Sequence, residues 1–183
     1  MRMFVAVRPS SDVIEELVEF LEPRDGMSWT RPENWHLTLA FMDRVPDHRV
    51  DELVERLGTA AGRVPPFLAR LTGAGAFPDP SRASVLWLGV NPEAVEPLGR
   101  LAVGARAAAN KSGATPDGKP FRAHLTLARP AGGRDATKWL RVLDTFYSSS
   151  WEVDEIHLIQ SFLGEGPRRS ARHEVVARLS LGG

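Results

Sequence analysis

A six-residue phrase that can carry acid–base chemistry occurs twice in the chain. Residues 36–41 read HLTLAF, and residues 124–129, 88 positions later, read HLTLAR. Side chains alternate across a β-strand, so the histidine and threonine of each copy point to one face and the leucines point to the other. Each copy therefore predicts a strand with one imidazole and one hydroxyl on its reactive face.

Two such strands facing each other supply the groups that phosphodiester cleavage needs. One neutral histidine can take the proton of the nucleophile, and one protonated histidine can give a proton to the leaving oxygen. The hydroxyls of Thr38 and Thr126 can donate hydrogen bonds to the charged phosphate oxygens. We therefore predict His36 and His124 as an acid–base pair, with Thr38 and Thr126 as phosphate-binding residues.

The phrases allow two other interpretations. A single histidine on a strand is often a buried structural residue, but two matching copies favour a shared functional site. A metal site is the other alternative, and neither phrase contains the Cys, Asp or Glu that would complete a good ligand set. We expect no metal and no cofactor.

The composition is typical of a globular protein, with 43% hydrophobic and 25% charged residues among 183. The 23 basic and 23 acidic residues balance, which argues against a protein that coats nucleic acid through bulk charge. The absence of cysteine excludes disulfides and thiol catalysis. The apolar run at residues 3–7 is too short for a signal peptide or a membrane span. We expect a cytoplasmic protein with no membrane contact.

Hydrophobic periodicity and turn residues predict the order of elements. A strand, a helix, a His-Thr strand and a helix are expected twice, which indicates an internal duplication. The segment 73–80 is expected to be a link and 164–172 a loop. The expected strands are residues 3–8, 28–30, 35–42, 67–71, 84–90, 122–129, 151–159 and 173–181, and the expected helices are 12–21, 47–62, 92–111 and 135–146.

The repeated order predicts an α+β fold made of two pseudo-symmetric lobes of antiparallel sheet, with helices on the outer faces. Early and late elements are expected to cross between the lobes. Residues 1–183 should therefore form a single domain of two intertwined lobes, rather than two separable units.

The phrases and the sequence around them resemble a known family. The chain is similar to the two-histidine (2H) phosphoesterases, which are defined by two His-x-Thr/Ser-x motifs. Within them it resembles the RNA 2′,3′-cyclic phosphodiesterases, the LigT-like proteins also called 2′-5′ RNA ligases. Besides the motifs, the similar segments are residues 2–7, 29–35, 75–78, 85–90, 119–123 and 161–164.

The resemblance implies a bilobal α+β fold with both His-Thr pairs lining a central cleft. It implies that the protein opens a terminal RNA 2′,3′-cyclic phosphate to a 2′-phosphate, with a weak reverse 2′-5′ ligation. It assigns His124 as proton acceptor and His36 as proton donor, although the residues alone would allow these roles to be exchanged. The implied partners are cyclic-ended RNA or cyclic nucleotides. We expect no obligate protein partner and a monomer.

Residues beside the motifs are expected to bind the substrate. The resemblance places Arg129 at the phosphate, with a solvated strand-end arginine as the alternative. Phe41, at the equivalent position, either stacks on a base or packs in the core, and Arg122 either meets the RNA backbone or is solvated. Relatives carry an aromatic residue after a Gly-Pro where this chain has residues 168–173, so base contacts should differ here, with His173 as the substitute.

Two alternative functions stay open at this point. The first is a phosphodiesterase acting on a 2′-5′ oligonucleotide or on a cyclic phosphate of an ADP-ribose derivative. The second is a non-catalytic module that binds RNA or a nucleotide. A substrate panel with product mapping distinguishes the first from the cyclic phosphodiesterase, and tight binding without turnover would identify the second.

Overall fold

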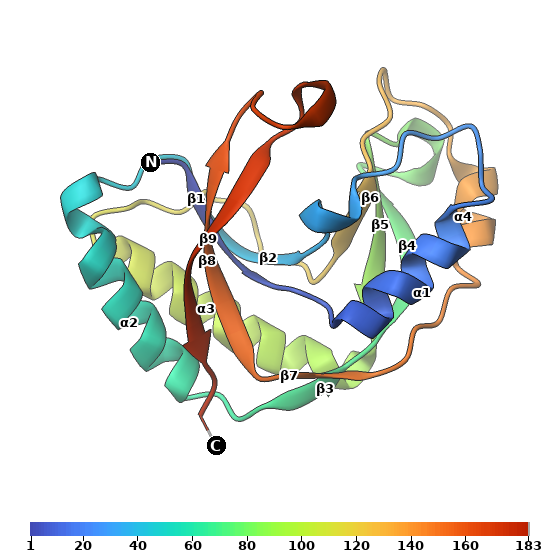
Figure 1. Ribbon diagram of the computed structural model, residues 1–183. Helices are drawn as coiled ribbons and strands as arrows, with labels where there is room; N and C mark the ends of the chain where they lie inside the picture. Colours follow the sequence, from blue (N-terminus) through green and yellow to red (C-terminus); the bar gives the residue numbers. More distant parts are fainter. Residues whose placement is uncertain (183) are drawn as a thin grey trace.

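The centre of the molecule is an antiparallel sheet of seven strands. The computed structural model describes residues 1–182. The strand order is β4–β5–β6–β2–β1–β8–β9 (Figure 1). The strands of this sheet are β1 (Met3–Val7), β2 (Leu37–Met42), β4 (Leu71–Phe77), β5 (Val85–Val90), β6 (Leu125–Ala128), β8 (Glu155–Phe162) and β9 (Arg172–Ser180); β3 (Phe67–Ala69) and β7 (Trp151–Val153) form a second, two-stranded sheet.

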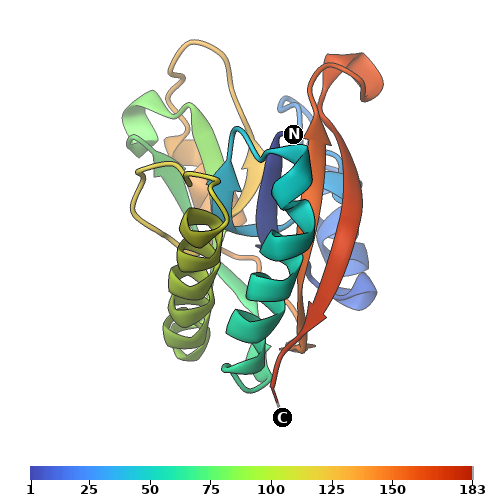
Figure 2. The same ribbon diagram turned by 90° about the vertical axis from the view of Figure 1, so that its left-hand side faces the viewer.

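Four α-helices pack against this framework and bury one face of the large sheet. Helices α2 and α3 pack side by side (Figure 2), and α4 contacts β4. Their apolar side chains join the inward-facing strand residues in a single core. The α-helices are α1 (Ser11–Leu21), α2 (Val50–Gly62), α3 (Pro92–Lys111) and α4 (Thr137–Leu143), and the short 3-10 segments are η1 (Pro32–Asn34), η2 (Asp47–Arg49), η3 (Pro80–Arg82) and η4 (Pro167–Arg169). No helix in residues 1–182 is long and apolar enough to cross a membrane.

Local sequence explains where α1 begins and how α2 and α3 approach each other. The Ser10 hydroxyl accepts a hydrogen bond from the backbone nitrogen of Val13 at 3.3 Å and so caps α1. In α3, a Cβ built at Gly104 would lie 3.1 Å from the Cβ of Ala60 in α2. Small residues at this contact let the two helix backbones come close together.

The two halves of the chain share a strand register as well as an element order. β1 pairs with the first phrase in β2, and β5 pairs with the second phrase in β6. In both ladders the first leucine, the threonine and the alanine of the phrase are paired, and the second leucine is not. The paired residues are Val7, Ala6 and Val5 with Leu37, Thr38 and Ala40, and Leu88, Trp87 and Leu86 with Leu125, Thr126 and Ala128. An irregularity at the same place in both phrases supports the predicted duplication.

The predicted α+β class and its antiparallel sheet are confirmed. The description as two lobes stays a prediction, as does the single domain over residues 1–183, whose last residue lies outside the described part. The two halves are joined in the middle of the sheet, where β2 pairs with β6. All long helices lie near their expected positions.

Two segments expected as single strands have other structures. Residues 28–30 form no strand, and only Trp29 makes an isolated bridge, to Ala128. The expected strand at 151–159 is two strands, β7 and β8, separated by Asp154 and belonging to different sheets. A continuous apolar pattern does not reveal the position at which a chain passes from one sheet to another.

The Gly/Pro-rich segment 73–80, expected as a link, is largely strand β4. Gly75 pairs with Trp87 of β5, and a Cβ at position 75 would lie only 2.0 Å from the indole. Glycine is therefore required here for the close approach of a neighbouring side chain rather than for a turn. The expected strand 67–71 accordingly ends at Ala69, and Leu71 begins β4.

Two helices are shorter than expected. The first turn of the segment 47–62 is the 3-10 segment η2, and α2 begins at Val50. The helix expected at 135–146 begins at Thr137, because the Asp135 carboxylate accepts hydrogen bonds from the Thr137 backbone nitrogen and hydroxyl at 3.0 and 2.8 Å. This local turn competes with helix formation at its first residues.

Candidate active site

The two phrases meet at the centre of the sheet, where β2 and β6 are joined by a single pair, Leu37 with Leu125. Both leucines are fully buried in the core. The residues on either side of each leucine must therefore point to the opposite face of the sheet. Leu37 and Leu125 are the equivalent residues of the two phrases, so the two halves of the chain meet at this pair.

The antiparallel register across this pair brings the two phrases together crosswise. Continued by one residue in each direction, it places His36 beside Thr126 and Thr38 beside His124. Each histidine thus neighbours the threonine of the other copy, and all four side chains are half-buried. The two histidines lie just before β2 and β6 rather than inside them, so the strands expected at 35–42 and 122–129 were too long at their starts.

His124 is held by its own backbone. Its Nδ1 lies 2.6 Å from the carbonyl oxygen of Arg122. A carbonyl only accepts hydrogen bonds, so Nδ1 carries the hydrogen, and the neutral ring has its lone pair on Nε2. Burial lowers the pKa of His124, with the charges of Arg129 and Arg122 adding to it and the Arg122 carbonyl opposing it. The ring is therefore suited to accept a proton at Nε2.

His36 occupies a different environment. Its ring stacks on Phe4 of β1, with centroids 4.6 Å apart and an interplanar angle of 30°. The ring of His173, in β9, lies 5.3 Å away. Burial lowers the pKa of His36 to about 3, and the charges of His173, Arg8 and Arg129 contribute in the same direction. His36 is therefore neutral at pH 7 in the free protein.

Arg8 fixes the turn from which His36 enters the site. Its guanidinium donates hydrogen bonds to the carbonyl oxygens of Pro32, Glu33 and Trp35 at 3.2, 3.1 and 2.9 Å. These carbonyls belong to η1 and the residue after it, immediately before His36. Arg8 was not among the predicted site residues, because nothing in the linear sequence connects the end of β1 with this turn.

Arg129 lies within electrostatic reach of both histidines, since its charge lowers the pKa of His36 and of His124. It is exposed and makes no hydrogen bond or ion pair inside the described part of the chain. An unpaired cation near both rings suits the predicted contact with a phosphate.

Two aromatic rings, those of Phe77 and Trp87, form a wall of the site beside His124. The ring of Phe77 meets that of His124 edge to face at 5.1 Å, and Trp87 lies 6.1 Å from it. The Arg122 guanidinium carbon lies 5.0 Å from the Trp87 ring, so this predicted substrate residue is held over the wall. Trp87 pairs with Thr126 and shares its face. The sequence reasoning missed Phe77 and Trp87 because their placement depends on strand pairing, although the glycine at position 75 was a signal.

Phe41 lies on the His36 side of the site. It packs with Phe4, Ala6 and Ile159 in a small apolar cluster on the open face of the sheet. The Arg2 guanidinium carbon is 4.3 Å from the centroid of its ring. The ring is only half-buried. Phe41 therefore packs against this cluster, and its predicted role in substrate binding stays a prediction.

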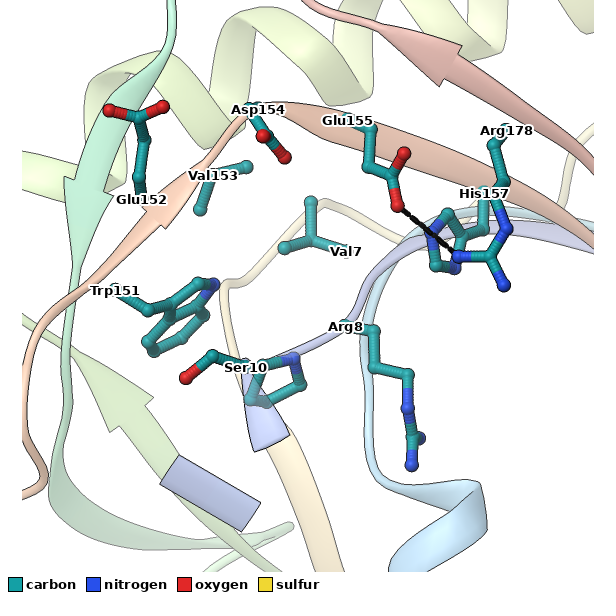
Figure 3. Close-up of a pocket in the computed structure, with 11 residues that line it drawn as sticks. Val7, Arg8, Ser10, Trp151, Glu152, Val153, Asp154, Glu155, His157 and Arg178 are labelled. Atoms are coloured by element: carbon teal, nitrogen blue, oxygen red, sulfur yellow. Dashed lines mark hydrogen bonds and ion pairs between the residues drawn. The ribbon is translucent and has the colours of Figure 1, made fainter. Parts of the chain in front are cut away.

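Another hollow, of about 270 Å³, lies at the end of β1 beside Arg8 (Figure 3). His157 is buried at its wall and lies 2.8 Å from the Glu155 carboxylate. Arg178 contacts the same carboxylate at 3.3 Å. Neither motif histidine lines this hollow. Within residues 1–182, no group of three or more His, Cys, Asp or Glu side chains is arranged to hold a metal ion.

The chain matches a family model and several curated proteins. The family model described as LigT like Phosphoesterase matches twice, over residues 5–87 and 88–168. A protein named RNA 2′,3′-cyclic phosphodiesterase from Aeropyrum pernix is 37% identical over 158 residues, covering 84% of this chain and 88% of that protein. One of the same name from Archaeoglobus fulgidus is 36% identical over 169 residues, covering 89% and 92%.

Solved structures show the same fold over the whole chain. TT0787 of Thermus thermophilus superposes with a TM-score of 0.77 at 29% identity, covering 100% of this chain and 99% of that one. Escherichia coli LigT complexed with 3′-AMP also gives a TM-score of 0.77, at 26% identity, covering 100% and 98%. The resemblance predicted from the motifs is confirmed.

Proposed function

The chain belongs to the LigT-like phosphoesterase family, and we propose that it opens the terminal 2′,3′-cyclic phosphate of RNA to a 2′-phosphate. The observation that carries the proposal is the crosswise arrangement of the two phrases around Leu37 and Leu125. It gives one face of the sheet two imidazoles and two hydroxyls in matching positions. The names of the curated relatives support the choice of substrate.

In the proposed reaction His124 is the base. Its Nε2 takes a proton from water while the water oxygen forms a bond to phosphorus. The bond between phosphorus and the 3′-oxygen breaks, and His36 gives its proton to that oxygen. The product is a 2′-phosphate with a free 3′-hydroxyl, and the proton held by His124 then returns to solvent. The chain's own acid and base complete this cycle.

The remaining residues bind and stabilise the phosphate in this proposal. The hydroxyls of Thr38 and Thr126 donate to the non-bridging oxygens, and Arg129 balances their charge. The bound anion also favours protonation of His36, whose pKa of about 3 in the free protein reflects burial among cations. Substrate binding therefore loads the acid with its proton.

The same arrangement supports a joining reaction, which is the reverse of cleaving a 2′-5′ linkage to a cyclic phosphate and a 5′-hydroxyl. A 5′-hydroxyl in the place of water would attack the cyclic phosphate, with His124 again as base, and form a 2′-5′ linkage. Water is far more concentrated than any 5′-end, so we propose that ligation is weak. Cyclic-ended RNA or cyclic nucleotides are the proposed partners, and a cytoplasmic monomer is the proposed state.

Product analysis on a cyclic-ended oligonucleotide tests the proposal. The oligonucleotide is incubated with the protein, with and without EDTA, and the terminal phosphate is mapped. We expect a 2′-phosphate at equal rates in both samples. A 3′-phosphate would contradict the bond assignment, and activity lost in EDTA and restored by a divalent cation would contradict metal independence. A 2′-5′ oligonucleotide and an ADP-ribose cyclic phosphate in the same panel test the substrate class.

A further inference from the structure

A third histidine lies beside His36. The rings of His36, His173 and Phe4 form a triangle, with centroid distances of 5.3 Å between the histidines, 4.6 Å from Phe4 to His36 and 5.0 Å from Phe4 to His173. The three rings come from parts of the chain far apart in sequence: β1, the residue before β2, and β9. Phe4 thus supports both imidazoles from one side and keeps them next to each other.

His173 borders a pocket that His36 does not line. It is half-buried, and its Nδ1 is buried without a hydrogen-bond partner. The pocket, of about 170 Å³, lies between η1 and the turn of the β8–β9 hairpin, and Arg31, Asn34 and Arg172 line it together with His173. Burial is the first cause of the low pKa of His36, and a substrate on the open face would bury it further. The pocket is lined by His173 and not by His36.

The charged groups around His36 and His173 are arginines, or carboxylates that are already paired with arginines. His36 faces Arg8 and Arg129, and His173 faces Arg2. The carboxylates nearest the pocket are engaged with arginines: Glu33 with Arg31, and Glu165 and Glu174 with Arg172. Burial, and then the charge of Arg2, lower the pKa of His173 as well. Among the groups whose charge acts on His36, the arginines stay protonated, so His173 is the one that can exchange a proton with it.

The spacing of the two imidazoles suits such an exchange. A straight N–H···N hydrogen bond between two imidazoles needs centroids about 5 Å apart. The observed 5.3 Å matches this distance, and the interplanar angle of 59° leaves a ring rotation as the movement needed to align the nitrogens.

We propose that His173 is a positioning residue for the acid of the reaction: it takes a proton from solvent through the pocket and shares it with His36. The proposal rests on the proposed function. The proton passes from His173 to His36 when the phosphate anion binds, then from His36 to the leaving 3′-oxygen. Solvent then reprotonates His173, so the proton that His124 releases balances the cycle.

Two substitutions at position 173 separate proton sharing from packing. His173→Phe keeps an aromatic ring against Phe4 but removes both nitrogens. His173→Gln keeps a hydrogen-bonding group that can accept from a protonated His36. His48→Phe, at an exposed histidine of η2, is the matched control. Thermal melting of each variant establishes that it is folded before rates are compared.

Rates on a nucleoside 2′,3′-cyclic phosphate, measured across pH, give the first test. We expect His173→Phe to lower kcat/KM about ten-fold or more and to move the alkaline limb of the profile to lower pH, because protonated His36 has lost its acceptor. We expect His173→Gln to restore part of both changes. An alkaline limb that is unmoved, or that moves to higher pH, overturns the proposal.

The leaving group gives the second test. A cyclic substrate with sulfur in place of the bridging 3′-oxygen releases a thiolate, which needs little help from an acid. We expect His173→Phe to lose far less activity on this substrate than on the oxygen compound. Equal losses on both substrates would mean that His173 holds the base or the fold rather than the proton, and no loss on either would also overturn the proposal.

A titration without turnover keeps this proposal separate from the proposed function. Imidazole NMR signals of the protein bound to 2′-AMP report the protonation of His36 directly. We expect the pKa of His36 in this complex to fall in His173→Phe and to recover in His173→Gln. An unchanged pKa would overturn proton sharing even if the wild-type protein proved inactive on cyclic-ended RNA.

Discussion

The Nδ1 of His124 lies 2.6 Å from the carbonyl oxygen of Arg122, two residues earlier in the chain. This contact fixes the tautomer of one histidine, whereas His36 stacks on Phe4. The two motifs are equivalent in sequence and in strand register, yet their histidines are prepared differently. This difference gives a physical basis for the proposed division of labour, with His124 as base and His36 as acid.

The tautomer of His124 is directly measurable. We expect neutral His124 to carry its hydrogen on Nδ1, because the Arg122 carbonyl can only accept. Nitrogen-15 chemical shifts at pH 8 distinguish the two tautomers, and exposed His48 provides a reference that averages between them. A His124 signal typical of hydrogen on Nε2 would contradict the assignment of this nitrogen as the proton acceptor.

Loss of either motif histidine should stop turnover. We expect His36→Ala and His124→Ala each to lower kcat on a cyclic-ended oligonucleotide by about 100- to 10,000-fold, the contribution usual for a general acid or base. His48→Ala, at an exposed position, is the control and should leave the rate unchanged. Activity that persists in either motif variant would rule out the two-histidine mechanism.

The sequence predicted most of the fold because periodicity and turn residues are local signals. The strand Met3–Val7 and the helix Pro92–Lys111 lie within a residue of their expected ends. The wrong predictions concerned segments whose structure depends on contacts with distant parts of the chain. Strand β4 was hidden by Gly75, whose role is to make room for Trp87, and the division between β7 and β8 depends on which sheet each one joins.

The same distinction applies to the site. His36, Thr38, His124 and Thr126 could be predicted as candidate site residues because the repeat is visible in the linear sequence. Phe77 and Trp87 were missed as site residues because only the pairing of β5 with β6 puts them beside His124. Arg8 acts on three carbonyls more than twenty residues away, and its role follows from the folded chain alone.

Arg129 is expected to act on the phosphate. Arg129→Gln removes the charge while keeping a polar side chain, and we expect kcat/KM to fall about 100-fold because the developing charge on the phosphate oxygens is less well stabilised. Steady-state kinetics on a cyclic nucleotide measures the loss. Arg141→Gln, an exposed arginine of α4, is the matched control. A loss of equal size in both variants would mean that bulk charge, rather than a specific contact, is responsible.

The buried histidines should make the free energy of unfolding depend on pH. The pKa of His36 is about 3 in the folded protein and about 6.5 when unfolded, and burial also lowers the pKa of His124. Between these values the unfolded state binds more protons, so stability should rise with pH and be lost progressively as pH falls from about 6.5 toward 3.

Urea denaturation of the wild-type protein and His36→Asn at several pH values between 7 and 4 measures this dependence. We expect the stability of the variant to fall less steeply with acidification, because one depressed histidine has been removed. Inorganic phosphate should reduce the slope in the wild-type protein, since a bound anion favours the protonated ring. Parallel slopes for the two proteins would show that His36 titrates in the folded state as it does in the unfolded chain.

Gly75 is expected to be required for the wall beside His124. A methyl group at position 75 would meet the Trp87 indole at 2.0 Å, so Gly75→Ala should displace the indole and destabilise the protein by about 1–3 kcal/mol. Activity should fall as well, because Trp87 shares a face with Thr126 and lies near His124. Urea denaturation and steady-state kinetics measure the two effects.

The clash can be separated from a loss of backbone freedom. Gly99→Ala in α3, where no atom lies within 4 Å of a new Cβ, should be neutral or stabilising because alanine favours a helix. Combining Gly75→Ala with Trp87→Leu should recover much of the stability, since the smaller side chain leaves room for the methyl group, while activity stays low without the indole. The alternative is that the two losses of stability simply add, so that the double variant loses the sum of what Gly75→Ala and Trp87→Leu lose singly. In that case position 75 would act through the backbone and not through the indole.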